Sequence, residues 1–272
     1  MSRIADCFAR ARAERRKALV IYLTASDPDG ETSLRLLQEA AGAGADIIEI
    51  GVPWSDPSAD GPAIQAAMHR ALAAGGGLRS TLAICKLVRQ KYPLVGLVLF
   101  GYANPIVVMG PEVFALRAAD AGADAVLCVD YPPDADRELT SALIRQGLDF
   151  IPLLAPTSTP PRIAAAAAVA SGFIYYVSLT GITGTKLEDL EAPRGQVESI
   201  RVATSGKVPV VVGFGIKTPA DARAIASFAD GVVVGSAAIQ LVERAIAAGR
   251  DPVPELGAFV RSLRDALASS PL

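Results

Sequence analysis

Histidine and cysteine are scarce in this chain. Its 272 residues include one histidine, His69, and three widely separated cysteines, Cys7, Cys85 and Cys128. A lone histidine excludes chemistry that needs paired histidines and argues against a Ser-His-Asp triad. On its helical stretch, His69 is expected to be a surface or packing residue. The cysteines lack metal-ligand spacing, so we expect reduced thiols in or near the core. Acid–base chemistry therefore falls to carboxylates.

Charge is also in short supply. Charged residues make up 20% of the chain and the net charge is −2, so no basic field exists to attract nucleic acid. Gly, Pro or charge interrupts every apolar run before it reaches the length of a membrane span. Residues 1–20 carry Arg, Asp and Glu where a signal peptide needs an apolar centre, which predicts an amphipathic helix instead. We expect a cytoplasmic protein that acts on a small molecule, without nucleic acid or membrane.

The chain does contain a recurring unit, in which a short apolar run rich in β-branched residues precedes a Gly/Pro/Asp turn and an Ala-rich amphipathic segment. Eight such runs are expected strands: 18–24, 46–52, 95–101, 125–130, 150–155, 173–179, 208–214 and 231–236. Continuous apolar runs suit parallel strands covered on both faces. The pattern predicts an α/β fold, a single (β/α)8 TIM barrel spanning 1–272, with an N-terminal helix and an extra helix within 60–77 after strand two. A doubly wound sheet is the alternative, but the first strand lacks a G-x-G-x-x-G turn after it.

Two carboxylates stand at or just beyond the second expected strand. Glu49 lies inside the apolar run 46–52, and Asp60 follows in the loop "SDPSADGP". In a barrel, a carboxyl group at that place reaches water only at the mouth, and burial raises its pKa toward neutrality. The alternative is a structural role for Glu49, in which its carboxylate pairs with a neighbouring Lys or a backbone N–H. Asp60 before Gly also suits a simple turn. Two carboxyls in unlike settings can divide acid and charge-stabilising roles.

Glycine turns follow the last three expected strands, at 178–186, 212–221 and 232–240. The last two precede helices and occupy the place where barrels often bind phosphate through backbone N–H groups and helix N-termini. Several aromatic residues fall near predicted strand ends: Tyr22, Phe100, Tyr102, Tyr175 and Phe214. Such residues are commonly core, and here they also suit the wall of an apolar pocket for a flat ring.

Taken together, these motifs resemble the alpha subunit of tryptophan synthase. "EIGVPWSDPSADGPAIQ" is similar to that family's signature, and "YLTASDPD", "YANPI", "GITGT", "GFGI" and "ADGVVVGSA" match it in order and spacing. The resemblance runs from about Tyr22 to Ala238 and implies a (β/α)8 barrel. It also implies a lyase that cleaves indole-3-glycerol phosphate to indole and glyceraldehyde 3-phosphate by a retro-aldol reaction.

The resemblance also implies residue roles. Glu49 corresponds to the family's catalytic glutamate and Asp60 to its loop aspartate. The positions that match substrate-contacting residues are Tyr22, Phe100, Tyr102, Leu127, Tyr175, Thr183 and Phe214. Those that match the phosphate-binding backbone are Gly184, Gly215, Gly235 and Ser236. Pro53 and Asp56 match the contact with a beta subunit in an alpha2beta2 heterotetramer. We expect no cofactor and no metal on this chain, with pyridoxal phosphate only on that partner.

The chain departs from the family pattern at Ser26, Cys128, Tyr131 and Leu179. These departures leave open a stand-alone lyase that releases indole, a paralogue for a modified indole, and a largely regulatory subunit. An isomerase acting on another sugar phosphate on the same barrel is a further alternative, disfavoured by the presence of both Glu49 and Asp60. An unrelated binding module is disfavoured because the acids and glycines gather at one end of the barrel.

Overall fold

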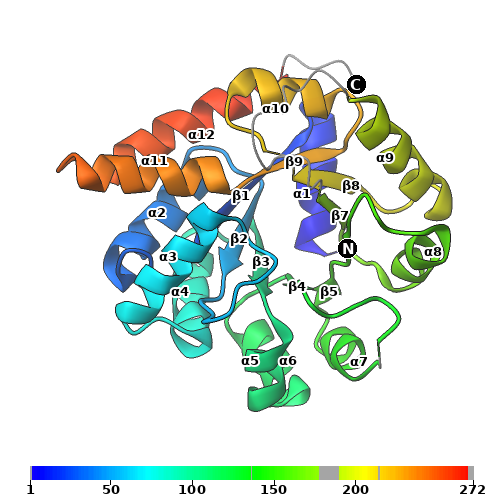
Figure 1. Cartoon of the computed structure of the whole chain (residues 1–272), viewed down its shortest axis with the longest axis horizontal. Coiled ribbons are helices and arrows are strands. Elements are labelled where there is room, and N and C mark those ends of the chain that lie inside the picture. Colours follow the sequence, from blue (N-terminus) through cyan, green and yellow to red (C-terminus); the bar gives the residue numbers. More distant parts are fainter. Residues whose placement is uncertain (1, 136, 178–189, 214, 269–272) are drawn as a thin grey trace.

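A parallel sheet curls into a barrel at the centre of the computed structural model, which describes residues 2–135, 137–177, 190–213 and 215–268 (Figure 1). Neighbouring strands follow the order β5-β4-β3-β2-β1-β9-β8-β7-β6. Their bounds are β1 (Ala18–Thr24), β2 (Ile47–Gly51), β3 (Gly96–Gly101), β4 (Ala125–Cys128), β5 (Asp149–Phe150), β6 (Leu153–Leu154), β7 (Ile174–Val177), β8 (Val210–Gly213) and β9 (Gly231–Val234). The predicted (β/α)8 barrel is confirmed.

The expected strand at 150–155 is divided in the structure. β5 pairs with β4, and β6 pairs with β7. Between them, the amide of Ile151 donates to the carbonyl of Val126, and the carbonyl of Pro152 accepts from the amide of Tyr175. Because proline has no N–H, the segment cannot continue one ladder through this point. One predicted strand is therefore two short ones, and the chain between them closes the barrel.

Helices form the outer layer around this sheet (Figure 1). Their bounds are α1 (Arg3–Ala13), α2 (Gly30–Gly42), α3 (Pro62–Ala73), α4 (Leu78–Lys91), α5 (Ala103–Met109), α6 (Pro111–Asp120), α7 (Glu138–Arg145), α8 (Pro160–Val169), α9 (Glu191–Ala203), α10 (Pro219–Ala226), α11 (Ser236–Ala247) and α12 (Pro252–Ala268). The predicted N-terminal helix is α1, and the extra helix after strand two is α3. The sequence did not predict the short α5, which inserts a second extra helix after β3.

Alternation along the strands separates two apolar layers. On β2, Ile48 and Ile50 pack outward among the residues that face the helices, whereas Ile47 packs inward in the barrel lumen. Side chains alternate between the two faces of a strand, so Glu49 shares the inward face with Ile47. The lumen is filled mainly by aliphatic and aromatic side chains from the other strands.

The N-terminal end of the barrel is closed by α1. Ile4, Cys7 and Phe8 from this helix are buried in the lumen cluster, and Phe8 makes an edge contact with Phe173 at 5.9 Å between ring centres. Carboxylates at the same end accept hydrogen bonds from amides near the start of neighbouring strands; one is Asp46, which accepts from Leu19 at 2.9 Å. With this end plugged, a ligand can reach the lumen only from the C-terminal mouth.

Within the described residues, no helix on its own has the length and apolar character to cross a membrane. The pair α3 and α4, bent by 98° from each other, passes that test together on length and composition only.

Candidate functional site

Glu49 lies in the barrel lumen, two residues before the end of β2. Its register neighbours are Tyr22 on β1 and Val98 on β3. The side chain is fully buried, and neither carboxyl oxygen has a hydrogen-bond partner among the described residues. Burial raises the pKa of Glu49 to about 8. The group is therefore mostly protonated at neutral pH and can both give and take a proton there. No Lys or backbone N–H among the described residues satisfies it, so the structural interpretation does not hold.

Asp60 lies in the loop between β2 and α3, and it is held by a residue that directly follows the next strand, β3. The Tyr102 hydroxyl donates to Asp60 Oδ2 at 2.6 Å, and the amide of Ala59 donates to the same hydroxyl at 3.1 Å. The side-chain amide of Gln65 donates to the Asp60 carbonyl at 2.8 Å. Burial raises the pKa of Asp60, and the hydrogen bond from Tyr102 opposes that rise. These hydrogen bonds hold the Asp60 carboxylate in one position, which a simple turn would not require.

Two buried tyrosines join the acids at the mouth. Burial raises the pKa of both Tyr22 and Tyr175 well above the usual value, and the negative charges of Glu49 and Asp60 raise both further. Tyr22 is the register neighbour of Glu49, and Tyr22 and Tyr175 belong to the same lumen cluster. The structure therefore brings together three of the site residues that the sequence predicted, Glu49, Tyr22 and Tyr175.

Glycines at strand ends make room for these tyrosines. A methyl group on Gly51, at the end of β2, would overlap the Tyr22 hydroxyl, and one on Gly213, at the end of β8, would overlap the Tyr175 hydroxyl. Each tyrosine thus lies across the end of the neighbouring strand. These two glycines are positioning residues that the sequence reasoning missed, although both lie within its quoted motifs, Gly51 in "EIGVPWSDPSADGPAIQ" and Gly213 in "GFGI".

An apolar wall stands beside the acids. Phe100 packs edge-on against Tyr22, with 5.0 Å between ring centres, and Leu127 is its register neighbour on β4. All three are buried in the lumen cluster. This surface is chemically suited to one side of a flat ring. Tyr102 differs from them, because its hydroxyl is engaged with Asp60.

The candidate phosphate turns follow β8 and β9. Gly215 adopts a left-handed backbone with φ 46°, and it is exposed. Gly235 is the N-cap of α11 and Ser236 is its first residue; no side chain caps this helix end. Uncapped N–H groups at a helix N-terminus favour an anion. Three further predicted residues, Thr183, Gly184 and Phe214, lie outside the described residues.

The predicted partner contact has two unlike residues. Pro53 is buried within this chain, whereas Asp56 is exposed and accepts a hydrogen bond from the Ser55 hydroxyl at 2.5 Å. Elsewhere, the three cysteines are free and buried, as predicted, and His69 is exposed on α3. No group of His, Cys, Asp or Glu in the described part of the chain is arranged to hold a metal ion.

A buried acid of raised pKa in the mouth of a (β/α)8 barrel, with a second carboxylate on the loop above it, defines an acid–base barrel enzyme. Comparison with known proteins gives its family. Residues 8–268 match the family model for the tryptophan synthase alpha chain. The chain therefore belongs to the tryptophan synthase alpha chain family, whose members are indole-3-glycerol-phosphate lyases.

Individual relatives agree with this family. The chain is 47% identical over 267 residues to a tryptophan synthase alpha chain from Burkholderia mallei, covering 98% of this chain and 97% of the relative. It is 45% identical to that of Paraburkholderia phymatum, with 99% and 98% covered. Among solved structures, tryptophan synthase subunit alpha from Legionella pneumophila has a TM-score of 0.91 at 37% identity, with 98% of each chain covered. A chain of tryptophan synthase from M. tuberculosis has a TM-score of 0.88 at 33% identity, with 98% and 99% covered.

Proposed function

We propose that this chain cleaves indole-3-glycerol phosphate to indole and glyceraldehyde 3-phosphate, with Glu49 as the group that moves the proton. One observation carries this assignment: a carboxyl group that is fully buried, has no hydrogen-bond partner in the part of the chain that the structure describes, and has a pKa raised to about 8. A carboxylic acid with a pKa near the working pH is suited to general acid catalysis.

The reaction needs a proton on one carbon and loses one from an oxygen. Protonated Glu49 donates to C3 of the indole ring, which leaves the ring nitrogen positively charged. The glycerol hydroxyl next to the scissile bond then loses its proton and becomes the aldehyde. The electron pair of the broken C–C bond returns to the ring and restores neutral indole. Glu49, now a carboxylate, takes the hydroxyl proton, which returns it to its starting state.

Asp60 has a different role in this proposal. The positive charge that develops on the ring nitrogen is stabilised by a hydrogen bond from the ring N–H to the Asp60 carboxylate. The hydrogen bond from Tyr102 supports this role, because it favours the ionised form of Asp60 against the effect of burial. No described residue donates to Glu49 in this way, so the two acids differ in what stabilises their charged forms.

The remaining site residues bind the substrate. Tyr22, Phe100, Leu127 and Tyr175 form an apolar surface for the indole ring, and Gly215, Gly235 and Ser236 offer backbone N–H groups to the phosphate. Thr183, Gly184 and Phe214 enter the proposal through the family resemblance alone.

The partner in the proposal is a tryptophan synthase beta subunit in an alpha2beta2 assembly, with pyridoxal phosphate on that subunit. The structural relatives include chains from M. tuberculosis tryptophan synthase. Asp56 is exposed on the loop that carries Asp60, and Val107 is 67% exposed on α5, whose N-cap Tyr102 is hydrogen-bonded to that loop. These residues offer a partner both a polar and an apolar contact. A single domain over 1–272 and a cytoplasmic location stay predictions from the sequence; within the described residues, all strands belong to one sheet.

Steady-state cleavage of indole-3-glycerol phosphate by the purified chain tests the proposal, for wild type and Glu49→Gln, with and without a beta subunit. We expect Glu49→Gln to lower kcat by about a hundredfold or more, because positioned proton transfer is typically worth that much. Near-normal turnover by this variant would remove Glu49 from the mechanism. No cleavage by wild type under either condition would favour the regulatory subunit.

Association can be tested separately from catalysis. Val107→Asp should weaken binding to a beta subunit about tenfold or more, because it places a charge in an apolar contact. Val202→Asp is the matched control, since Val202 on α9 is 70% exposed but is not part of the proposed contact. Equal binding by both variants would contradict a contact at α5.

A further inference from the structure

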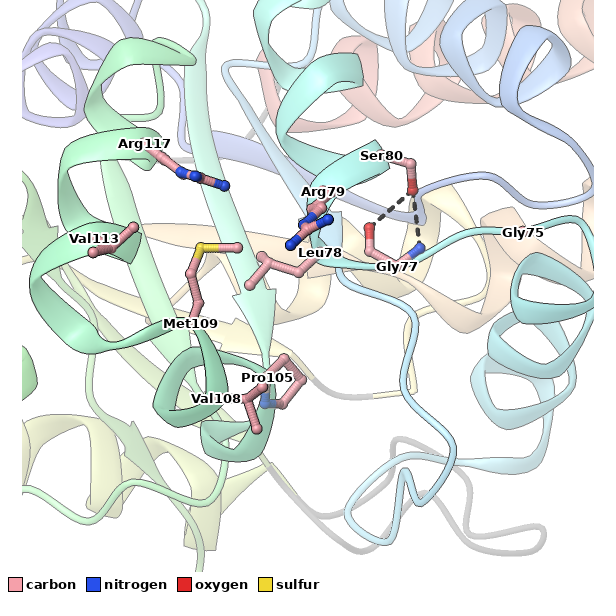
Figure 2. Close-up of a pocket in the computed structure, with 10 residues that line it drawn as sticks. All are labelled: Gly75, Gly77, Leu78, Arg79, Ser80, Pro105, Val108, Met109, Val113 and Arg117. Carbon is pink, nitrogen blue, oxygen red and sulfur yellow. Dashed lines mark hydrogen bonds between the residues drawn. The ribbon is translucent and has the colours of Figure 1, made fainter.

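A cavity of about 520 Å³ lies outside the barrel, between the start of α4 and the helices α5 and α6 (Figure 2). None of the site residues described above lines it. Its lining residues are Gly75, Gly77, Leu78, Arg79, Ser80, Pro105, Val108, Met109, Val113 and Arg117. The volume falls within the range of small-molecule sites, which is roughly 300–1,000 Å³.

Two arginines give the cavity a positive edge. Figure 2 shows the side chains of Arg79 from α4 and Arg117 from α6 extending toward the space between the two helices. Neither guanidinium makes an ion pair or hydrogen bond with any described residue, and no acidic residue lines this cavity. An adjoining cavity of about 320 Å³ shares both arginines and adds Lys86 and Asp120. Positive charge therefore exceeds negative charge in both cavities.

The start of α4 adds to this field. Gly77 is the N-cap of this 14-residue helix, and it has no side chain to cap the first amides. Ser80 closes on Gly77 instead: its hydroxyl accepts from the Gly77 amide and lies 2.9 Å from the Gly77 carbonyl (Figure 2). A helix N-terminus carries a partial positive charge. Arg79 and this helix end therefore favour an anion on the same wall.

The rest of the lining is apolar. Leu78 and Met109 lie below the two arginines in Figure 2, with Pro105 and Val108 further below. Val108 is 82% exposed, which leaves a large aliphatic surface uncovered beside two unpaired guanidinium groups. A simple inorganic anion would use the charges and leave this surface in water. An anion with an apolar body would cover both.

We propose that this cavity binds a small organic carboxylate with an apolar body, its carboxylate between Arg79 and Arg117 and its body against Leu78, Met109 and Val108. The planar guanidinium group suits bidentate contact with a carboxylate. The site lies outside the catalytic mouth, and the proposal does not depend on the reaction assigned to Glu49.

Met109 provides a local reporter for the test. The chain has three methionines, so labelling with ¹³C-methyl methionine gives a simple NMR spectrum in which Met109→Leu identifies the Met109 signal. The probe is 3-phenylpropionate, titrated into the full-length protein. We expect the Met109 signal to shift and saturate with a Kd of about 1 mM, a value typical of so small a ligand. The signal of Met68, fully buried on α3, should not move.

Matched variants and ligands test the charge. The double variant Arg79→Gln/Arg117→Gln should bind 3-phenylpropionate about tenfold or more weakly than wild type, because each substitution removes a charge-assisted hydrogen bond. Arg162→Gln, at an exposed arginine on α8, should leave it unchanged. The neutral 3-phenylpropan-1-ol should bind about tenfold more weakly than the carboxylate. Glu49→Gln should bind the probe like wild type, which separates this cavity from the mouth.

Three results would overturn the proposal. The first is a Met109 signal that stays fixed up to about 10 mM probe. The second is equal binding by the double arginine variant or by the neutral alcohol. The third is loss of beta-subunit binding in the double variant without any probe binding by wild type, which would assign the cavity to a protein contact instead.

Discussion

The hydroxyl of Tyr102 lies 2.6 Å from Oδ2 of Asp60 and donates a hydrogen bond to it. Tyr102 directly follows β3 and caps the start of α5, whereas Asp60 belongs to the loop after β2. The same hydroxyl accepts from the Ala59 amide at 3.1 Å. One side chain thus ties the loop to the neighbouring strand and favours the charged form of its carboxylate.

Tyr102→Phe should lower kcat/KM about tenfold, because a hydrogen bond to a charged group is typically worth roughly 1.5–3 kcal/mol. Without that donor, burial alone acts on Asp60 and its pKa rises. Asp60 must be ionised to stabilise the ring nitrogen, so the acidic limb of the pH–rate profile should move to higher pH. Steady-state kinetics over a pH series measures both effects.

Tyr92→Phe is the matched control for that change, since Tyr92 follows α4 and makes its cation contact with Lys91. It loses a hydroxyl outside the mouth and should keep wild-type kinetics. An unchanged acidic limb in Tyr102→Phe would mean that Tyr102 acts through packing alone.

Glu49 should set the alkaline limb of the same profile. Its pKa is raised to about 8 by burial, and it must be protonated to donate to the ring carbon. In the free enzyme, kcat/KM should therefore fall as the pH rises through about 8. The residual activity of Glu49→Gln should lack this limb. If wild type and variant fall in parallel, another group titrates there.

The same shift predicts how stability depends on pH. Glu49 has a pKa of about 8 in the folded protein, against 4.5 as the ordinary value. Between these values the folded state binds more protons than the unfolded state, so the free energy of unfolding falls as pH rises. Wild type and Glu49→Gln should respond alike below about pH 4.5, and at about pH 9 the variant should have gained several kcal/mol relative to wild type.

Urea unfolding at a series of pH values measures this difference. Glu31→Gln, at an exposed position on α2, is the control and should follow the wild-type curve. Parallel curves for wild type and Glu49→Gln would show that the buried carboxyl group does not differ between the folded and unfolded states.

The fold was readable from the sequence because strand and helix signals agree along most of the chain. The run 18–24 is β1 with the predicted bounds, and the extra helix predicted within 60–77 is α3. The break at Ile151 and Pro152 was missed because the apolar run continues through it. Only the change of pairing partner from β4 to β7 reveals two strands.

The site was predictable to the extent that it follows from strand register. Glu49, Tyr22 and Phe100 lie on adjacent strands and face the same lumen, which alternation along each strand requires. The Tyr102 hydrogen bond depends on the path of a loop, for which no periodic signal exists. The fit of the Tyr22 hydroxyl above Gly51 depends on spacing between strands, which the sequence does not encode locally.

Ser26 carries backbone strain that a single substitution should relieve. Its φ is 65° and its side chain is buried, in a region of backbone conformation that favours glycine. Left-handed backbone costs an L-residue roughly 1–2 kcal/mol, and the greater flexibility of unfolded glycine offsets part of the gain. The Ser26 hydroxyl has one long contact, 3.5 Å to that of Ser80, while its amide bond to Ser33 does not need the side chain. Ser26→Gly should therefore raise the free energy of unfolding by about 1 kcal/mol, and Ser26→Ala, which keeps the strain, should stay within about 0.5 kcal/mol of wild type.

Ser205, which is exposed and has φ 52°, is the matched position for comparison. Ser205→Gly should raise the free energy of unfolding by a similar amount. Urea midpoints at an unchanged m-value measure these effects, and a loss of stability in Ser26→Gly would mean that the buried side chain contributes more than the strain it carries.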